Sequence, residues 1–131
     1  MKEPASQPMT AEGYEQLLRA NLVRVFGERD RARRRAAIAE LYGPDAALYE
    51  PHAVATGHDA IDAAVGELLT QVPPAFVFAA DGPVVGHHGI ARLRWTAGPV
   101  NGPVAVTGTD IAHITAGRIQ SLYVLLDPPG K

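Results

Sequence analysis

The sequence predicts one α+β domain in which three helices come first and an antiparallel sheet follows. Up to Pro73 and Pro74, apolar residues recur mainly at helical spacing. Beyond this pair, short segments rich in β-branched and aromatic residues are separated by turn-forming Gly, Pro, Asn and Asp. Helices followed by consecutive strands are typical of the α+β class. The length of 131 residues fits a single domain, with residues 1–10 as a flexible tail.

Three predicted helices occupy the first part of the chain. The first begins after Thr10, which can cap it, and ends near Gly27. The second spans residues 31–42, and the third lies between Gly57 and Pro73. Each carries an apolar stripe on one face, so we expect all three to pack against the sheet.

The predicted strands lie mostly after the third helix. One short strand, 46–50, precedes that helix and leads into a loop or short hairpin. The later strands span residues 75–80, 89–97, 104–115 and 118–126, with a short strand or bulge at 84–85.

Composition narrows the function classes before any motif is considered. Hydrophobic residues make up 47% of the chain and the net charge is −2, which does not indicate a nucleic-acid-binding protein. The chain has no cysteine and no histidine spacing typical of a metal site. No apolar run approaches the roughly 20 residues that cross a bilayer. We therefore expect a cytoplasmic protein with no cofactor or metal and with no nucleic-acid or membrane partner.

Five arginines fall between residues 29 and 35, on and just before the second helix. Because these positions spread around much of the helix circumference, the pattern favours a solvated helix over an anion-binding site.

The predicted strand 104–115 places one carboxylate on an apolar face. Because strand side chains alternate, Asp110 is the only polar residue in its row. A buried, unpaired carboxylate is costly, and burial raises its pKa. Asp110 is therefore either a structural carboxylate bonded to a buried Tyr, Trp or Arg, or an acid or base with a task. Gly108 is expected to leave space beside it for a ligand.

Two further residues could accompany Asp110. Glu50 ends its strand just before Pro51, where a side chain can face either solvent or the mouth of a cavity. Trp95 lies in an apolar row, where it could fill the core, stack on a ligand or donate its indole N–H to a carboxyl. A catalytic interpretation requires Glu50 and Asp110 to line the same cavity.

The last predicted strand, 118–126, is apolar on both faces. Alternation groups Leu122, Val124 and Leu126 on one face and Ile119, Tyr123 and Leu125 on the other. Since the three helices can cover only one face, we expect a homodimer through the other. The alternative is that the strand is central within the core of one chain.

Several motifs, in this order, resemble the nuclear transport factor 2-like superfamily over about residues 12–127. Residues 41–51 (LYGPDAALYEP) resemble a helix end, a strand and an acidic residue before proline, and Gly57 precedes the next helix. The segments at 108–110 (GTD), 117–119 (GRI) and 126–127 (LD) resemble the C-terminal pattern of SnoaL-like polyketide cyclases and ketosteroid isomerases. The resemblance implies a cone-shaped fold, with three helices on a curved antiparallel sheet that encloses a pocket.

The resemblance also implies roles for both carboxylates. In ketosteroid isomerases the acidic residue before proline is the general base, and it matches Glu50 here. The position that matches Asp110 is a protonated acid of their oxyanion hole, and in SnoaL-like cyclases a pocket aspartate is the general acid/base. The tyrosine that isomerases carry on the first helix has no match, since the nearest residues are Asn21, Leu22 and Phe26.

The implied function is acid/base chemistry by Asp110 and Glu50 on an apolar small molecule such as a polyketide or steroid-like compound. Isomerisation, cyclisation and dehydration all remain open. The alternative is a non-catalytic ligand-binding or protein-assembly module of the same fold. The residues expected to contact the ligand are Leu22, Phe26, Trp95, Ala112, Ile114, Leu122 and Val124.

Overall fold

The computed structural model describes residues 9–128. Its elements are α1 (Ala11–Asn21), the π-helical segment η2 (Leu22–Phe26), α2 (Arg31–Leu41), β1 (Tyr42–Glu50), β2 (Ala53–Thr56), α3 (His58–Thr70), β3 (Phe76–Ala80), β4 (Val85–His87), β5 (Ile90–Pro99), β6 (Val106–Thr115) and β7 (Arg118–Leu126). The predicted α+β class is confirmed. Of the predicted tail, residues 1–8 lie outside the described part, whereas Met9 packs against the core and Thr10 caps α1.

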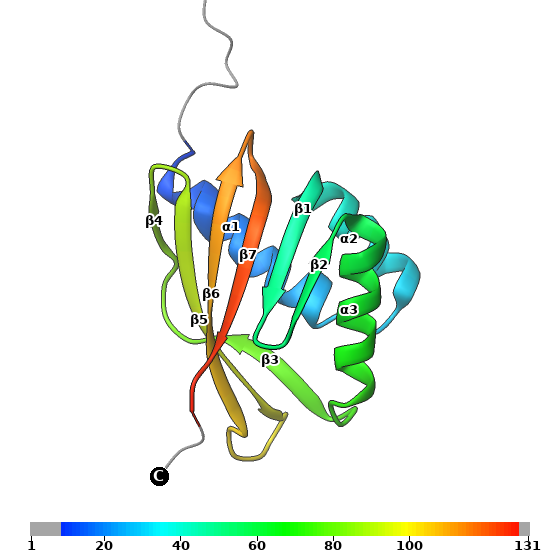
Figure 1. Cartoon of the computed structure of the whole chain (residues 1–131). Helices are drawn as coiled ribbons and strands as arrows, with labels where there is room; N and C mark the ends of the chain where they lie inside the picture. Colours follow the sequence, from blue (N-terminus) through cyan, green and yellow to red (C-terminus); the bar gives the residue numbers. More distant parts are fainter. Residues whose placement is uncertain (1–8, 129–131) are drawn as a thin grey trace, which may run out of the picture.

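All strands belong to one seven-stranded sheet. Its order is β2-β1-β7-β6-β5-β3, and β4 pairs with the first residues of β5. Every pair is antiparallel except β1 and β7, which run parallel. A parallel pair needs a long connection, and here it is formed by everything between β1 and β7. Figure 1 shows the sheet curving and the helices gathered on one side of it.

The helices and the sheet bury a continuous apolar core between them. Its completely buried members include Leu18, Ile38, Leu48, Ile61, Leu93 and Leu122, which come from α1, α2, β1, α3, β5 and β7. The first helix widens from α-helix to π-helix over its last turn, Leu22–Phe26. Such π-helical turns occur frequently at functional sites, and this one contributes two side chains to the cavity described below.

The structure places Ile119 on the opposite face of β7 from the one that strict alternation predicts. The pairing of β6 with β7 shifts by one residue between His113 and Ile114, so Ile119 lies opposite Ile114 and is completely buried. A β-bulge adds one residue to a strand and so reverses the alternation beyond it. Tyr123 and Leu125 stay on the outer face, where both are exposed.

The arginine-rich helix is only partly solvated. Arg31 and Arg33 are largely exposed, as predicted, but Arg34 is buried and donates to Asp62 of α3 over 2.7 Å. This buried ion pair joins α2 to α3, and the sequence pattern did not reveal it.

Candidate active site

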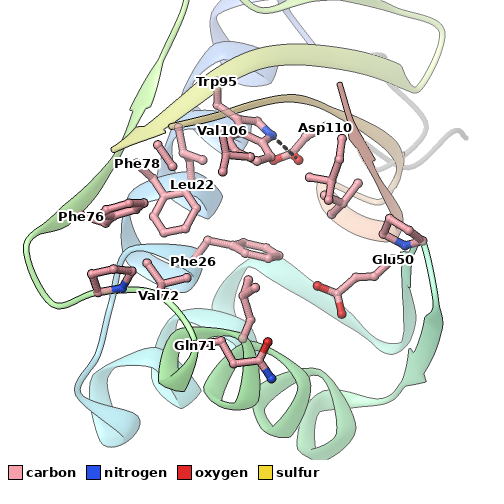
Figure 2. Close-up of a pocket in the computed structure, with 16 residues that line it drawn as sticks. Leu22, Phe26, Glu50, Gln71, Val72, Phe76, Phe78, Trp95, Val106 and Asp110 are labelled. Atoms are coloured by element: carbon pink, nitrogen blue, oxygen red, sulfur yellow. Dashed lines mark hydrogen bonds between the residues drawn. The ribbon is translucent and has the colours of Figure 1, made fainter. Parts of the chain in front are cut away.

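A cavity of about 260 Å³ lies between the helices and the sheet. Its walls come from η2, the end of α3 and the connection that follows it, β3, β5, β6, β7 and the end of β1. Figure 2 shows these side chains converging from different elements on one space. Of the predicted ligand contacts, Leu22, Phe26, Trp95 and Val124 line the cavity. The other three, Ala112, Ile114 and Leu122, are buried in the core and lie outside its described lining.

Both predicted carboxylates line this one cavity. Asp110 comes from the middle of β6 and is only 3% exposed, whereas Glu50 ends β1 and is half-buried. Figure 2 shows Glu50 reaching toward Phe26 from one wall while Asp110 lies on another. The two acids are far apart in the chain, and the pairing of β1 and β6 on either side of β7 brings their strands near each other.

Asp110 has one hydrogen-bond donor in the described part of the chain. The indole N–H of Trp95 donates to its Oδ1 over 2.9 Å. No donor to Oδ2 is found among the described residues, and this carboxyl group is part of the cavity wall. Oδ2 is therefore the oxygen through which Asp110 can exchange a proton or a hydrogen bond with a ligand.

The strand register explains how Trp95 reaches Asp110. Trp95 lies directly opposite Gly108, two residues before Asp110. A Cβ atom on Gly108 would lie 2.5 Å from Cζ2 of the indole, so only glycine accommodates the ring there. The space expected beside Asp110 is therefore filled by Trp95 and is not open to a ligand. The ligand-accessible side of Asp110 is the cavity instead.

Burial controls the protonation of both acids. It raises the pKa of Asp110 to about 7, and the weaker opposing effect of the Trp95 hydrogen bond lowers it. Burial also raises the pKa of Glu50 above its ordinary value. A carboxyl that titrates near neutrality can be protonated or ionised at ordinary pH, as a general acid or base requires.

Asn21 and Tyr42 form a buried polar pair that the sequence analysis did not predict. The Tyr42 hydroxyl donates to Oδ1 of Asn21, and both residues are completely buried. Burial, followed by the charges of Asp110 and Glu50, raises the pKa of Tyr42 well above its usual value. Tyr42 therefore stays neutral, and neither residue is part of the described cavity lining.

Sequence reasoning also missed the wall formed after α3. Gln71, Val72 and Pro73 line the cavity, and so do Phe76 and Phe78 of β3. The guanidinium of Arg29 fixes this connection by donating to the carbonyls of Leu69, Val72 and Pro73. The alternation of Phe76 and Phe78 indicates that both side chains lie on one face of a strand. Which face of the sheet this is depends on the pairing of β3 with β5.

Two negative findings apply to the described residues. Within residues 9–128, no group of three or more His, Cys, Asp or Glu side chains is placed to hold a metal ion. None of the helices in this part of the chain combines the length and apolar character needed to cross a membrane.

Comparisons with known proteins agree with this architecture. A family model described as the SnoaL-like domain matches residues 20–122. No curated protein matches the chain. Among solved structures, a proposed isomerase of the SnoaL-like family from Agrobacterium tumefaciens is similar, with a TM-score of 0.82 and 23% identity. That match covers 89% of this chain and 99% of the other.

Two more solved structures share the fold at lower identity. A proposed polyketide cyclase from Sinorhizobium meliloti has a TM-score of 0.66 and 19% identity, covering 88% of this chain and 99% of its own. A proposed ketosteroid isomerase from Kribbella flavida has a TM-score of 0.69 and 12% identity, covering 92% and 82%. Nuclear transport factor 2-like proteins also share it. At such identities the likeness shows the fold alone.

Proposed function

Because the chain belongs to the SnoaL-like domain family, whose model matches residues 20–122, we propose that its cavity is the active site of a proton-transfer enzyme. The observation that carries the proposal is that two carboxyl groups of raised pKa, Asp110 and Glu50, line one apolar cavity. The proposed reaction is an isomerisation, cyclisation or dehydration of an apolar small molecule. Family membership supports this class of chemistry without selecting among the three.

In the proposed mechanism Asp110 acts on an oxygen of the substrate. Below about pH 7 its carboxyl is mostly protonated, and Oδ2 can donate to a carbonyl or hydroxyl oxygen. As negative charge develops on that oxygen, the hydrogen bond strengthens because the surrounding wall is apolar. The Trp95 N–H holds the other oxygen of the carboxyl and fixes its orientation.

Glu50 is the proposed partner that acts on carbon. It lies at the end of β1 with its carboxylate directed into the cavity (Figure 2). Its raised pKa makes it a stronger base than an ordinary glutamate once it is ionised. Glu50 would remove a proton from the carbon beside the carbonyl, and in an isomerisation it would return that proton to another carbon. These two proton-transfer roles, of Asp110 and of Glu50, require no cofactor.

Hydrogen–deuterium exchange next to a carbonyl tests the proposal without knowledge of the natural substrate. The probes are 4-isopropylcyclohexanone and androst-4-ene-3,17-dione in deuterated buffer, with exchange followed by mass spectrometry. Wild-type protein should accelerate exchange of at least one probe. Asp110→Asn and Glu50→Gln should each reduce the rate by about 100-fold or more, the range typical of general acid–base groups.

Matched control variants distinguish a loss of catalysis from a general effect of removing a carboxylate. Asp59→Asn and Glu40→Gln make the same chemical changes at exposed positions, and both should keep the wild-type rate. Equal exchange by wild type, Asp110→Asn and Glu50→Gln would remove both carboxylates from the mechanism. The rate should also fall as pH rises beyond about 7, because Asp110 then loses its proton.

A protein-assembly module of the same fold is the second candidate, and the outer sheet face is the surface that such a module would use. Tyr49 and Tyr123 stack there with ring centroids 4.5 Å apart, and Tyr123 and Leu125 are nearly half exposed. We propose that this face binds a second copy of the chain. Size-exclusion chromatography with light scattering should give a dimer at micromolar concentration, and a monomer would contradict the homodimer.

A further inference from the structure

We infer that the ligand of this cavity is an uncharged cyclic molecule of about ten non-hydrogen atoms, with one hydrogen-bond-accepting oxygen directed at Asp110. This inference rests on the proposed function, because it names the ligand of the same cavity. It departs from the steroid-sized compounds that the family resemblance suggests.

The size limit comes from the cavity volume. An apolar cavity of about 150 Å³ in an engineered protein binds benzene, which has six carbon atoms. By proportion, the volume of about 260 Å³ accommodates about ten non-hydrogen atoms. A tetracyclic steroid has about twice that number of atoms, so much of it would remain outside.

The exposure of the lining residues shows which walls are closed. Leu22, Phe26 and Trp95 are each at most 5% exposed, so the walls that they form are closed to solvent and well packed. Val106 and Leu126 are 40% and 50% exposed and border the opening. Since protein interiors are close-packed, a larger ligand cannot enter further without displacing the buried walls.

The charge limit comes from the polar groups of the lining. Among the described lining residues, only Glu50, Gln71 and Asp110 are polar or charged, apart from the indole N–H of Trp95. No lysine, arginine or histidine lines the cavity in the part of the chain that the structure describes. A carboxylate or phosphate ligand would lose its hydration and meet two acids with no counter-charge, which is strongly unfavourable.

A cationic ligand is the nearest competitor, because aromatic faces and carboxylates attract cations. The deepest polar group argues against it. Asp110 is 3% exposed, and within residues 9–128 its only donor is the Trp95 N–H, so ionising it to bind a cation is costly. Its protonated form instead offers a donor through Oδ2, and the complementary ligand group is a neutral acceptor oxygen.

Four probes test size and charge separately. The compounds 4-isopropylcyclohexanone, 4-isopropylcyclohexylamine and 4-isopropylcyclohexanecarboxylate share one skeleton and are neutral, cationic and anionic. Androst-4-ene-3,17-dione is a neutral, tetracyclic counterpart. Binding is measured at about pH 6, where Asp110 is protonated, by calorimetry and by the fluorescence of Trp95. Trp95 is the only tryptophan of the chain and lies in the cavity wall, so its emission reports on this site.

The expected result is that the ketone binds at least about 10-fold more tightly than each of the other three probes. Two variants check where it binds. Ala97→Leu fills the cavity from β5 and should abolish ketone binding, whereas Ala79→Leu, at an exposed position of β3, should not. Should Ala97→Leu fail to fold, Val106→Phe at the exposed rim should still weaken ketone binding.

Several outcomes would overturn the inference. One is that the ketone does not bind at millimolar concentration. Another is that the steroid, the amine or the carboxylate binds as tightly as the ketone or more tightly. A third is that Ala97→Leu and Val106→Phe both leave ketone binding unchanged. The proposed function fails differently. Steroid exchange that depends on Asp110 would remove the size limit and keep the enzyme, whereas ketone binding without Asp110-dependent exchange would keep the ligand class and remove the enzyme.

Discussion

Asp62 and Asp110 are equally buried, each with 3% of its surface exposed, but their surroundings differ completely. Asp62 lies between α2 and α3 and contacts the guanidinium groups of Arg31, Arg34 and Arg35. Asp110 lies between the sheet and the cavity and receives a single neutral hydrogen bond from Trp95.

The pKa values of these two acids move in opposite directions. Burial alone would raise the pKa of Asp62, but the hydrogen bonds from Arg34 and Arg31 and their charges outweigh it, so the pKa falls below its usual value. For Asp110 the hydrogen bond from Trp95 is too weak to offset burial, and the pKa rises to about 7. Burial alone therefore does not raise the pKa of an aspartate, whereas burial without a cationic partner does.

The two aspartates differ in the cationic partners that surround them. Three arginines surround Asp62, and none lines the cavity among the described residues. The arginine-rich run therefore joins two helices, and Asp110 has no cationic partner among the described residues. Each of the following substitutions should affect the surroundings of one of these two aspartates and leave those of the other unchanged.

The largest effect is expected from Arg34→Leu. This change leaves Asp62 buried without its closest partner, and breaking a buried ion pair typically costs about 3–5 kcal/mol of unfolding free energy. Urea denaturation should show this loss, while the emission of Trp95 in the native state stays unchanged. Arg33→Leu removes an exposed arginine of the same helix and should cost much less. Equal losses from the two variants would contradict a structural role for the buried pair.

Asp110→Asn should stabilise the protein at alkaline pH. Between about pH 4 and pH 7 the folded wild-type protein keeps a proton on Asp110 that the unfolded chain has released, so stability falls as pH rises through this window. Because asparagine does not titrate, the variant loses this pH dependence of stability. Its side-chain oxygen can still accept the hydrogen bond from the Trp95 N–H. We expect the variant to gain about 2–4 kcal/mol relative to wild type between pH 4 and pH 8.

Asp62→Asn is the matched control and should show the opposite sign. Its carboxyl has a lowered pKa in the folded state, so it contributes stability above its unfolded pKa that is lost as pH falls. Replacing it should therefore destabilise the protein at neutral pH. Parallel pH profiles for the two variants would mean that the two sites do not differ as described.

Gly108→Ala should disturb the surroundings of Asp110 and leave those of Asp62 unchanged. The added methyl would lie 2.5 Å from the indole of Trp95 and 2.8 Å from the Leu125 carbonyl oxygen. We expect a loss of about 1–3 kcal/mol and a shifted Trp95 emission, because the ring must move away from Asp110. Gly43→Ala is the control, since its methyl would lie 3.2 Å from the Gln120 side-chain oxygen, which can move, and 3.8 Å from the Ile119 carbonyl oxygen. An unchanged emission spectrum for Gly108→Ala would contradict the proposed positioning.

The smallest effect is expected from Trp95→Phe. Loss of the indole N–H removes the one interaction that lowers the pKa of Asp110, so this pKa should rise further. Carbon-13 NMR of the Asp110 carboxyl measures the change. Phe78→Leu alters the ring next to Trp95 without touching the hydrogen bond and should leave the pKa nearly unchanged.

Much of the fold was predictable because local signals agree with it. Thr10 and Asp30 both cap helices as expected, and Pro73 and Pro74 separate the helical part from the strands. The position of Asp110 on an apolar face followed from alternation alone, and its burial is confirmed. The parallel pairing of β1 with β7 and the bulge before Ile119 depend on contacts between distant segments, which periodicity does not encode.

The cavity was only partly predictable, for a similar reason. Leu22, Phe26, Trp95 and Val124 were expected and line it, since each lies on the inner face of its own element. Gln71, Val72 and Pro73 line it because Arg29 holds their segment in place from another part of the chain. The filling of the Gly108 space by Trp95 required the register of β5 and β6.

A direct titration of the two buried aspartates tests whether Asp110 keeps its proton near neutral pH while Asp62 does not. Carbon-13 NMR of the side-chain carboxyls, assigned with Asp110→Asn and Asp62→Asn, follows both groups in one sample across the pH range. We predict that Asp110 titrates at a pKa of about 7 and that the pKa of Asp62 lies below the ordinary range of an aspartate, because of its arginine partners. An Asp110 carboxyl that ionises together with Asp62 would contradict this prediction, because Asp110 would then be ionised at neutral pH and could not be the proposed proton donor.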